Sequence, residues 1–248
     1  MTAPDKPAAG LRAVILAGGR GTRLHPFTIN FPKPLMPLGD KPVLEVLMER
    51  LLAHGVTDMT LALGHLGELV KAYFDQKPDW KKRITLRLVH EDAPLGTAGA
   101  LSLVPDLKDT FLVLNGDLLT DLDVGALVAF HRERGAALTI AAHTREVKID
   151  LGVLDIDADR RVTGYREKPV STLEVSMGIY VYEPRVLKWI KPGVLLDFPD
   201  LVLALLRAGE RVVAFPGRCQ WLDIGRPDDY RQAQELFTKD AGPSMTSV

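Results

Sequence analysis

The stretch LAGGRGTRLHP, residues 16–26, follows the short apolar run RAVILA, which predicts a β-strand over residues 12–17. Its three glycines allow positive φ angles and let backbone N–H groups approach phosphate oxygens, and Arg20 and Arg23 add positive charge. The stretch is neither a Walker A loop nor the GxGxxG fingerprint, because Leu24 stands where the third glycine belongs. A tight turn is the simpler interpretation of the glycines alone. We predict instead a loop that holds a nucleoside triphosphate.

Outward from this loop, the hydrophobic pattern alternates between strand-like and helix-like periods, which is typical of an α/β fold with a largely parallel sheet. From about residue 136 strand patterns predominate, and we expect a mixed, partly antiparallel region there. The expected strands after the first are 59–64, 84–90, 111–117, 137–143, 152–157, 161–167 and 174–183, with further strand-like stretches at 211–216 and 219–225. The expected helices are 43–55, 68–74, 123–134, 200–207 and 228–237. We predict a single domain over residues 11–238, with a disordered lead-in (1–10) and a disordered tail (239–248).

Composition limits the classes of partner. The formal net charge of -1 removes a whole-protein electrostatic attraction for nucleic acid or anionic membranes. Cys219 is the only cysteine, so no intrachain disulfide can form, and we expect a reducing, cytoplasmic compartment. The richest apolar run, residues 194–206, is interrupted by Asp197, Pro199 and Asp200, so no membrane span is expected. The first ten residues do not have the pattern of a secretory signal.

Lys33 is a candidate phosphate ligand. It lies in FPKPLMP, residues 31–37, where flanking prolines restrict the backbone. A lysine held in this way loses little backbone entropy when it binds a phosphate. Taken alone, a solvated lysine in an extended linker is the simpler interpretation.

Two aspartates end apolar runs that are far apart in the chain. Asp117 closes VLNGD and Asp223 lies in WLDIG. Mg²⁺ prefers one or two carboxylates together with phosphate oxygens and water, so this pair is a candidate magnesium site. A helix N-cap for Asp117 and a turn carboxylate for Asp223 are the alternatives.

Glu167 and Lys168 follow the expected strand 161–167, just before Pro169. A glutamate can accept hydrogen bonds from sugar hydroxyls while the neighbouring lysine pairs with a phosphate, so the dipeptide suits a sugar phosphate. A surface ion pair is the alternative. The six histidines show no metal-ligand spacing. The chain has no GxSxG motif, so covalent catalysis by a serine nucleophile is not indicated.

In order along the chain, LAGGRGTRL, PKPL, PLGTAGAL, NGD, EKP, GIYVYE and WLDIG resemble the sugar nucleotidyltransferases, and in particular the short bacterial mannose-1-phosphate and heptose-1-phosphate guanylyltransferases. The similarity covers residues 12–237. It implies a Rossmann-like three-layer sandwich with a mostly parallel mixed central sheet. It also implies a reaction that joins a nucleoside triphosphate to a sugar 1-phosphate, releases pyrophosphate and forms an NDP-sugar, with Mg²⁺ as cofactor.

The resemblance further implies a role for each matching residue. Arg23, Lys33, Asp117 and Asp223 would be catalytic, with both aspartates holding Mg²⁺. The implied nucleotide-binding residues are Leu16, Ala17, Gly18, Gly19, Gly21, Thr22, Glu91, Gly96 and Thr97. The implied sugar-phosphate-binding residues are Asn115, Gly152, Glu167, Lys168, Ser176 and Gly178.

The choice of base and sugar depends on a few positions. Glu91 stands about where thymidylyl relatives carry a glutamine, and a carboxylate suits the N1–H and N2–H₂ donor edge of guanine. We therefore expect GTP. Ser176 and Leu151 replace an asparagine and a tyrosine that are common in mannose-type relatives, which leaves room for a modified hexose or a heptose.

Three alternatives remain open at this point: a uridylyl- or thymidylyltransferase acting on glucose-type sugars, a non-catalytic sugar-nucleotide-binding regulatory protein, and a glycosyltransferase. The last would use the DxD pattern of Asp121 to Asp123, although Asp123 is a plausible helix N-cap. A homo-oligomer is compatible with the sequence.

Overall fold

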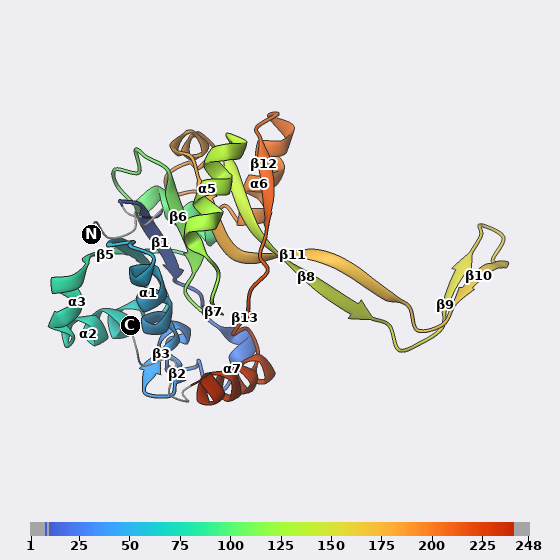
Figure 1. Cartoon of the computed structure of the whole chain (residues 1–248), viewed down its shortest axis with the longest axis horizontal. Helices are drawn as coiled ribbons and strands as arrows, with labels where there is room; N and C mark the ends of the chain where they lie inside the picture. Colours follow the sequence, from blue (N-terminus) through green and yellow to red (C-terminus); the bar gives the residue numbers. More distant parts are fainter. Residues whose placement is uncertain (1–7, 9, 241–248) are drawn as a thin grey trace, which may run out of the picture.

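A seven-stranded mixed sheet forms the centre of the protein in a computed structural model that describes residue 8 and residues 10–240 (Figure 1). The strand order is β12-β8-β11-β6-β1-β4-β5. All neighbours pair in parallel except β11, which runs antiparallel to β6 and β8. The strands are β1 (Arg12–Ala17), β4 (Asp58–Leu63), β5 (Thr85–His90), β6 (Phe111–Asn115), β8 (Leu138–Lys148), β11 (Val170–Tyr182) and β12 (Val212–Pro216). The expected mostly parallel mixed sheet is confirmed.

Helices cover both faces of this sheet. The helices are α1 (Val43–Ala53), α2 (Gly67–Asp75), α3 (Pro78–Arg83), α4 (Gly96–Gly99), α5 (Val124–Arg134), α6 (Phe198–Arg207) and α7 (Pro227–Asp240). Side chains alternate along β1, so Ala13 and Ile15 belong to the core under α1, α2 and α5. Val14 belongs to the second core, with Leu201 and Leu205 of α6. The two cores make the three-layer sandwich that the resemblance implied.

The boundaries of α5 follow from local chemistry. The Asp123 carboxylate accepts a hydrogen bond from the Ala126 N–H at 2.9 Å, and Gly135 ends the helix with a φ of 54°. The expected N-cap is therefore confirmed. No helix follows Asp117, which lies between β6 and β7 (Leu118–Thr120), so the N-cap alternative for that residue is wrong. The helix α3 is not anticipated by the sequence patterns, and the stretch 94–101 contains the short helix α4.

A small third core lies beneath the glycine loop. Leu24 of that loop packs with Leu38 of β2 (Pro37–Leu38) and with Tyr230 and Ala233 of α7. The Tyr230 hydroxyl also donates to the Pro37 carbonyl at 2.7 Å. The strand β2 pairs with β3 (Lys41–Pro42). Since Lys33 lies between Leu24 and β2, this core holds the segment that carries the lysine.

Strands β8 and β11 continue beyond the sheet as a two-stranded ribbon, here called the arm (Figure 1). Its far end carries the antiparallel pair of β9 (Val153–Ile156) and β10 (Val162–Arg166). The expected antiparallel pairing of the second half is confirmed by these contacts. The arm departs from the body where the register of β8 and β11 shifts, between Ser176 and Tyr180.

Among the described residues, no helix has both the length and the apolar character that crossing a bilayer requires. The predicted lead-in and tail fall largely on residues 1–7, 9 and 241–248, which lie outside the described part of the chain. The single domain over residues 11–238 stays a prediction.

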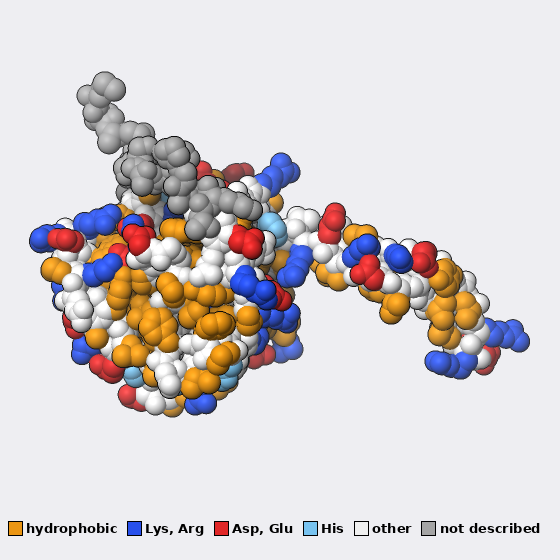
Figure 2. Space-filling view, turned by 90° about the horizontal axis from the view of Figure 1, so that it is seen from below, with side chains coloured by type: hydrophobic (Ala, Val, Ile, Leu, Met, Phe, Trp, Pro, Cys, Tyr) orange, Lys and Arg blue, Asp and Glu red, His pale blue; other side chains and the backbone are white. Residues whose placement is uncertain are grey.

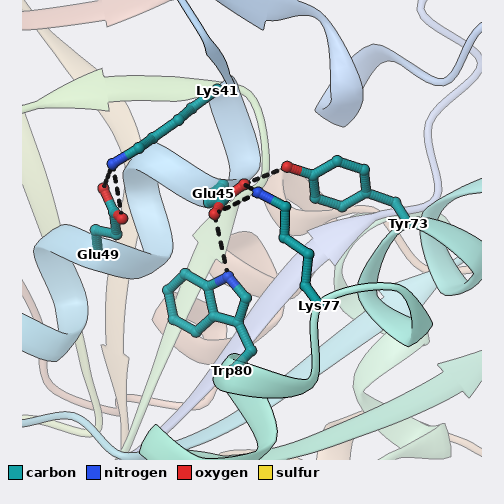
Figure 3. Close-up of polar contacts among 6 residues, drawn as sticks. All are labelled: Lys41, Glu45, Glu49, Tyr73, Lys77 and Trp80. Atoms are coloured by element: carbon teal, nitrogen blue, oxygen red, sulfur yellow. Dashed lines mark hydrogen bonds and ion pairs between the residues drawn. The ribbon is translucent and has the colours of Figure 1, made fainter.

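A carboxylate in α1 connects this helix to α2 and α3 (Figure 3). Glu45, whose side chain is 7% exposed, accepts hydrogen bonds from Lys77 Nζ at 2.6 and 2.8 Å, from Trp80 Nε1 at 3.2 Å and from the Tyr73 hydroxyl. Burial raises the pKa of Glu45, but the hydrogen bonds from Lys77, Tyr73 and Trp80 outweigh it, so the pKa is lower than usual. The ionised carboxylate therefore stabilises the fold.

We expect Glu45→Gln to lower the free energy of unfolding at pH 7 by about 2 kcal/mol, because a buried, multiply bonded carboxylate loses its charge. Chemical denaturation measures the difference. Glu49→Gln is the control, since the Lys41–Glu49 pair shown beside it is partly exposed and should change stability by less than about 0.5 kcal/mol.

The stability difference between wild type and Glu45→Gln should depend on pH. The pKa of Glu45 is lower in the folded than in the unfolded chain, so its stabilisation is complete above the ordinary value of 4.5. This stabilisation is lost as the pH falls below 4.5 and through the lowered pKa of the folded protein. The stability difference between wild type and Glu45→Gln should therefore shrink in that acidic range, and a constant difference would contradict the role given to the charge.

Candidate active site

A cleft of about 640 Å³ opens at the carboxyl ends of the parallel strands. Loops that follow β1, β4, β5 and β6 line it, as expected where parallel strands end at one edge of a sheet. Thirteen of the residues singled out in the sequence line this cleft: Leu16, Ala17, Gly18, Gly19, Gly21, Thr22, Arg23, Lys33, Glu91, Gly96, Thr97, Asn115 and Asp117. The cleft therefore brings together the glycine loop, Lys33 and the end of β6.

The glycine loop approaches the loop after β4 backbone to backbone. The Gly18 carbonyl accepts a hydrogen bond from the His65 N–H at 3.1 Å, and a Cβ on Gly64 would lie 2.7 Å from the Gly18 oxygen. A Cβ on Gly18 would lie 2.6 Å from Glu91 Oε1, whereas a Cβ on Gly19 would meet no atom within 4 Å. A side chain at Gly18 would therefore displace the Glu91 carboxylate and crowd the Gly64 backbone, whereas Gly19 faces open space.

Gly21 has a φ of 62°, in the left-handed region that favours glycine. Its carbonyl accepts hydrogen bonds from the Thr28 hydroxyl at 2.6 Å and from the Leu24 N–H at 2.9 Å. These bonds turn the loop back toward Lys33, and a Cβ on Gly21 would lie 3.3 Å from the Lys33 Cβ. The local geometry therefore couples the loop to the lysine.

Lys33 contacts both aspartates that the sequence proposed as a pair. Its Nζ forms an ion pair with Asp117 and lies 4.0 Å from Asp223 Oδ1, and its side chain is 10% exposed. The aspartates meet because Asp223, in β13 (Trp221–Asp223), pairs with Leu118 of β7. The Ile224 N–H also donates to the Asp117 carbonyl at 3.1 Å. Asp223 thus adjoins the cleft beside Asp117 although it is distant in sequence.

The electrostatics of this pair fit a bound cation. Burial and the neighbouring Asp117 carboxylate raise the pKa of Asp223, while Lys33 and Arg23 oppose the rise. Asp117 Oδ1 is buried and has no hydrogen-bond partner among the described residues. Within the same residues, no group of three or more His, Cys, Asp or Glu side chains is placed to hold a metal ion. Two carboxylates with an unpaired oxygen suit Mg²⁺ if phosphate oxygens and water complete its coordination.

Gly96 and Thr97 are held by the segment before α6. Gly96 has a φ of 76°, and a Cβ there would lie 2.6 Å from the Leu196 carbonyl oxygen. The Thr97 N–H donates to Asp197 Oδ1 at 3.1 Å, and the Thr97 hydroxyl accepts from the Phe198 N–H at 2.8 Å. Both residues line the cleft, but these polar groups of Thr97 already have partners within the protein.

Asn115, Gly178 and Ser176 lie together at the base of the arm. Gly178 has a φ of 74°, and a Cβ there would lie 2.6 Å from Asn115 Nδ2. The Ser176 hydroxyl donates to the Tyr180 hydroxyl at 3.2 Å, at the register shift of β11. Asn115 lines the cleft, so this group adjoins it at the end where the arm begins.

The structure does not bring Gly152, Glu167 and Lys168 into the cleft. They lie together at the far end of the arm, where the Tyr165 hydroxyl donates to Glu167 Oε2 at 2.8 Å. A side chain at Gly152 would overlap the same hydroxyl, so glycine is needed for Tyr165 to cross it. Their predicted contact with the sugar phosphate is not made within this chain and stays a prediction.

Several cleft residues were not anticipated from the sequence: Gly64, His65, Asp92, Asp197 and Gly225. Arg20, which also lines the cleft, was anticipated only as a positive charge in the glycine loop. Gly64 and His65 directly follow β4, so the rule that identified Asp117, a polar or glycine residue just after an apolar strand, could have found them. Asp197 had no such signal, since it follows no strand and reaches the cleft through its contact with Thr97.

A glycine loop and a lysine–aspartate ion pair at the carboxyl edge of a parallel sheet, with a second carboxylate beside them, are features that suit the binding of phosphate groups. The chain belongs to the nucleotidyl transferase family, whose model matches residues 12–240. It is 36% identical over 241 residues to a UTP–glucose-1-phosphate uridylyltransferase of Synechocystis, covering 90% of this chain and 62% of that protein. It is 35% identical over 236 residues to a mannose-1-phosphate guanyltransferase of Schizosaccharomyces pombe, covering 92% and 64%. The chain thus spans less than two thirds of the length of these curated relatives.

Among solved structures, HddC from Yersinia pseudotuberculosis is similar, with a TM-score of 0.69 and 29% sequence identity. The match covers 92% of this chain and 99% of that one. The relatives divide between guanylyl and uridylyl names, so kinship by itself does not assign a base.

Substitutions at the two adjacent glycines separate packing from ligand binding. Gly18→Ala displaces the Glu91 carboxylate and crowds the Gly64 N–H, so it should lower the free energy of unfolding by about 1 kcal/mol. Gly19→Ala meets nothing in the protein and should change stability by less than about 0.5 kcal/mol, yet it should weaken binding of a nucleoside triphosphate about tenfold or more, because it blocks close approach of phosphate to the backbone. Thermal unfolding and calorimetric titration measure the two effects. Unchanged affinity in Gly19→Ala would remove this loop from the binding site.

Proposed function

We propose that this chain transfers a nucleotidyl group from a nucleoside triphosphate, GTP in preference, to a sugar 1-phosphate of the mannose-type hexose or heptose class. The products are an NDP-sugar and pyrophosphate. One observation carries the proposal: the glycine loop, Lys33, Asp117 and Asp223, which are far apart in the sequence, adjoin one cleft. Family membership and the names of both relatives support it.

In this reaction an oxygen of the sugar phosphate attacks the α-phosphorus, and the bond from that phosphorus to the bridging oxygen breaks. Pyrophosphate leaves with the electron pair. Both reactants are anionic, and two unit charges 4 Å apart repel by about 4 kcal/mol even at an effective dielectric constant near 20. Arg20, Arg23 and Lys33 line the cleft and offset this repulsion. Positioning and electrostatic stabilisation can then supply most of the catalysis without a covalent intermediate.

The two aspartates serve as the candidate ligands of Mg²⁺. Asp117 offers its unpaired Oδ1, and Asp223 lies next to it across the β7–β13 pair. When bound, Mg²⁺ would neutralise phosphate oxygens on which charge develops. Lys33 offsets part of the charge of the two carboxylates and keeps Asp117 in place through their ion pair.

The preference for GTP rests on Glu91. Its Oε2 accepts a hydrogen bond from the Leu95 N–H at 2.9 Å, which holds the side chain at the wall of the cleft. A carboxylate only accepts hydrogen bonds, and this suits the two donors on the edge of guanine. Uridylyl transfer is the second candidate, because the Synechocystis relative is named for it.

A matrix of four nucleoside triphosphates against mannose-, glucose- and heptose-type sugar 1-phosphates tests the proposal, with pyrophosphate release and product mass as readouts. We expect the highest kcat/KM with GTP. Glu91→Gln keeps an acceptor for the Leu95 N–H but places an amide donor at the other position, so the ratio of GTP to UTP use should fall about tenfold or more. An unchanged ratio would refute the role of Glu91, and nucleotide binding without turnover for any pair would favour a regulatory protein.

The metal assignment has its own test. Asp117→Asn removes a charged oxygen donor and should reduce Mg²⁺-dependent turnover about 10²-fold or more. Asp123→Asn is the matched control, because asparagine is an equally good N-cap for α5 and should leave both turnover and stability unchanged. Equal loss in both variants would instead favour the DxD alternative, and full activity of Asp117→Asn would exclude this aspartate as a metal ligand.

A further inference from the structure

The arm has one polar and one apolar face. Residues directly opposite each other in the β8–β11 register share a face, so Thr172 and Glu146 lie on one side, and Leu173 and Arg145 lie on the other. The apolar side carries Leu173, Val147 and, where the ribbon continues, Ile149, which are 41–50% exposed, whereas Val170 is the exposed apolar residue on the otherwise polar side of the described ribbon. Nothing among the described residues covers this side of the ribbon.

The far end of the arm repeats the pattern. In the β9–β10 pair, Tyr165 lies opposite Leu154, and Val162 lies opposite Ile156. These four side chains share one face and are 42–62% exposed. The other face carries the Asp155–Arg166 ion pair. The apolar character therefore extends along the arm.

An isolated two-stranded ribbon is at best marginally stable in water, and it becomes stable when it packs an apolar face against another surface. Seven apolar or aromatic side chains on this face of the arm are 41–62% exposed, and a run of exposed apolar side chains is typical of an interaction site. Figure 2 shows orange side chains along the arm, well away from the body of the same chain. The arm therefore presents an apolar surface that the described part of its own chain leaves exposed.

Lys168 lies far from the cleft of its own chain. Ten residues of mostly extended strand separate it from Gly178, which contacts Asn115 at the cleft, and this corresponds to about 30 Å at 3.3 Å per residue. Lys168 also adopts a left-handed φ of 43° directly before Pro169, a combination that sterics disfavour. Backbone strain of this kind is typical of functional positions.

The body offers a matching apolar groove beside the cleft. Six of its lining residues are apolar or aromatic, namely Phe27, Phe31, Met36, Pro37, Pro227 and Tyr230, and Arg231 and Gln234 complete the lining. Phe27 and Phe31 are 50% and 41% exposed, and hydrophobic side chains gather on the underside of the body (Figure 2). The loop that forms the groove runs from the glycine loop to Lys33, and its Thr28 bonds Gly21. A ribbon seated there would bring its end close to the phosphate-binding residues.

We propose that two copies of this chain form a symmetric dimer in which the arm of each copy covers the apolar groove of the other and inserts Glu167 and Lys168 into the partner's cleft. The inference rests on the proposed function, because it assigns the sugar phosphate to the partner subunit's Lys168. A two-fold arrangement uses the same two surfaces, arm and groove, on both copies and leaves neither exposed. It also adds a cation to those of Arg20, Arg23 and Lys33, of which Lys33 is already paired with Asp117.

Heterodimers with differently tagged subunits test the exchange of arms. One subunit carries Asp117→Asn and the other Lys168→Ala, and each variant alone should lose activity. In the mixed dimer one cleft is intact and receives an intact arm, so about half of the wild-type rate per dimer should return. The reciprocal control places both substitutions on one subunit beside a wild-type subunit, and that dimer should be inactive. Activity in the control and none in the mixed dimer would show that each arm serves its own cleft and would overturn the proposal.

A second pair of variants tests the interface without reference to activity. Leu173→Glu places a charge on the apolar face opposite Arg145, and Thr172→Lys places one on the polar face opposite Glu146, so both preserve favourable pairing within the ribbon. Sedimentation should show that the wild type is a dimer of about twice the 27.3 kDa chain mass. The Kd of dimerisation should rise at least tenfold in Leu173→Glu and should be unchanged in Thr172→Lys.

These readouts distinguish the two levels of the proposal. A monomeric wild type, whether its arm folds back or binds another protein, overturns the dimer, as does equal behaviour of Leu173→Glu and Thr172→Lys. Full activity of Lys168→Ala overturns the role of its side chain in the partner's cleft. If the wild type is a dimer that depends on Leu173 but turns over no substrate pair, the proposed function fails while the arm interface stands.

Discussion

The ion pair of Lys33 with Asp117, beside Asp223, is the constraint on which the site depends. Bringing two carboxylates together costs electrostatic energy unless a cation lies with them, and Lys33 is that cation within the chain. Burial first, and then the neighbouring Asp117, raise the pKa of Asp223, while Lys33 and Arg23 oppose the rise. A phosphate-bound cation would oppose it further, which links the charge balance of the protein to the proposed reaction.

The fold brings the three charges together through different devices. Parallel strands deliver the glycine loop and Asp117 to the same edge of the sheet. The short β7–β13 pair brings Asp223 from more than a hundred residues away, and the small core under α7 fastens the segment of Lys33. Most of these contacts are apolar or backbone contacts, so the site is supported by parts of the protein that need not touch a ligand.

The arm contrasts with this rigid support. A hydrogen bond joins Tyr165 to Glu167 at its far end, and with respect to the described residues the side chains of its apolar face stay 41–62% exposed. A surface of this kind is costly to keep in water, so its persistence along the whole ribbon indicates a covering surface. Assigning that cover to a second copy accounts at once for the exposed face, the apolar groove and the distance of Lys168 from its own cleft.

Much of the protein could be predicted from its sequence alone. The period of apolar residues determined β1, the alternating elements and the mixed sheet, because side-chain burial repeats every two residues in strands and about every 3.6 in helices. The glycine loop and Asp117 could be placed because functional residues collect just after parallel strands. Only the tertiary structure decided that Asp223 meets Lys33, that Asp197 holds Thr97, and that Glu167 and Lys168 lie on an arm away from the cleft. These contacts join residues remote in sequence, and a local pattern carries no information about which distant segments pair or in which direction a ribbon leaves the sheet.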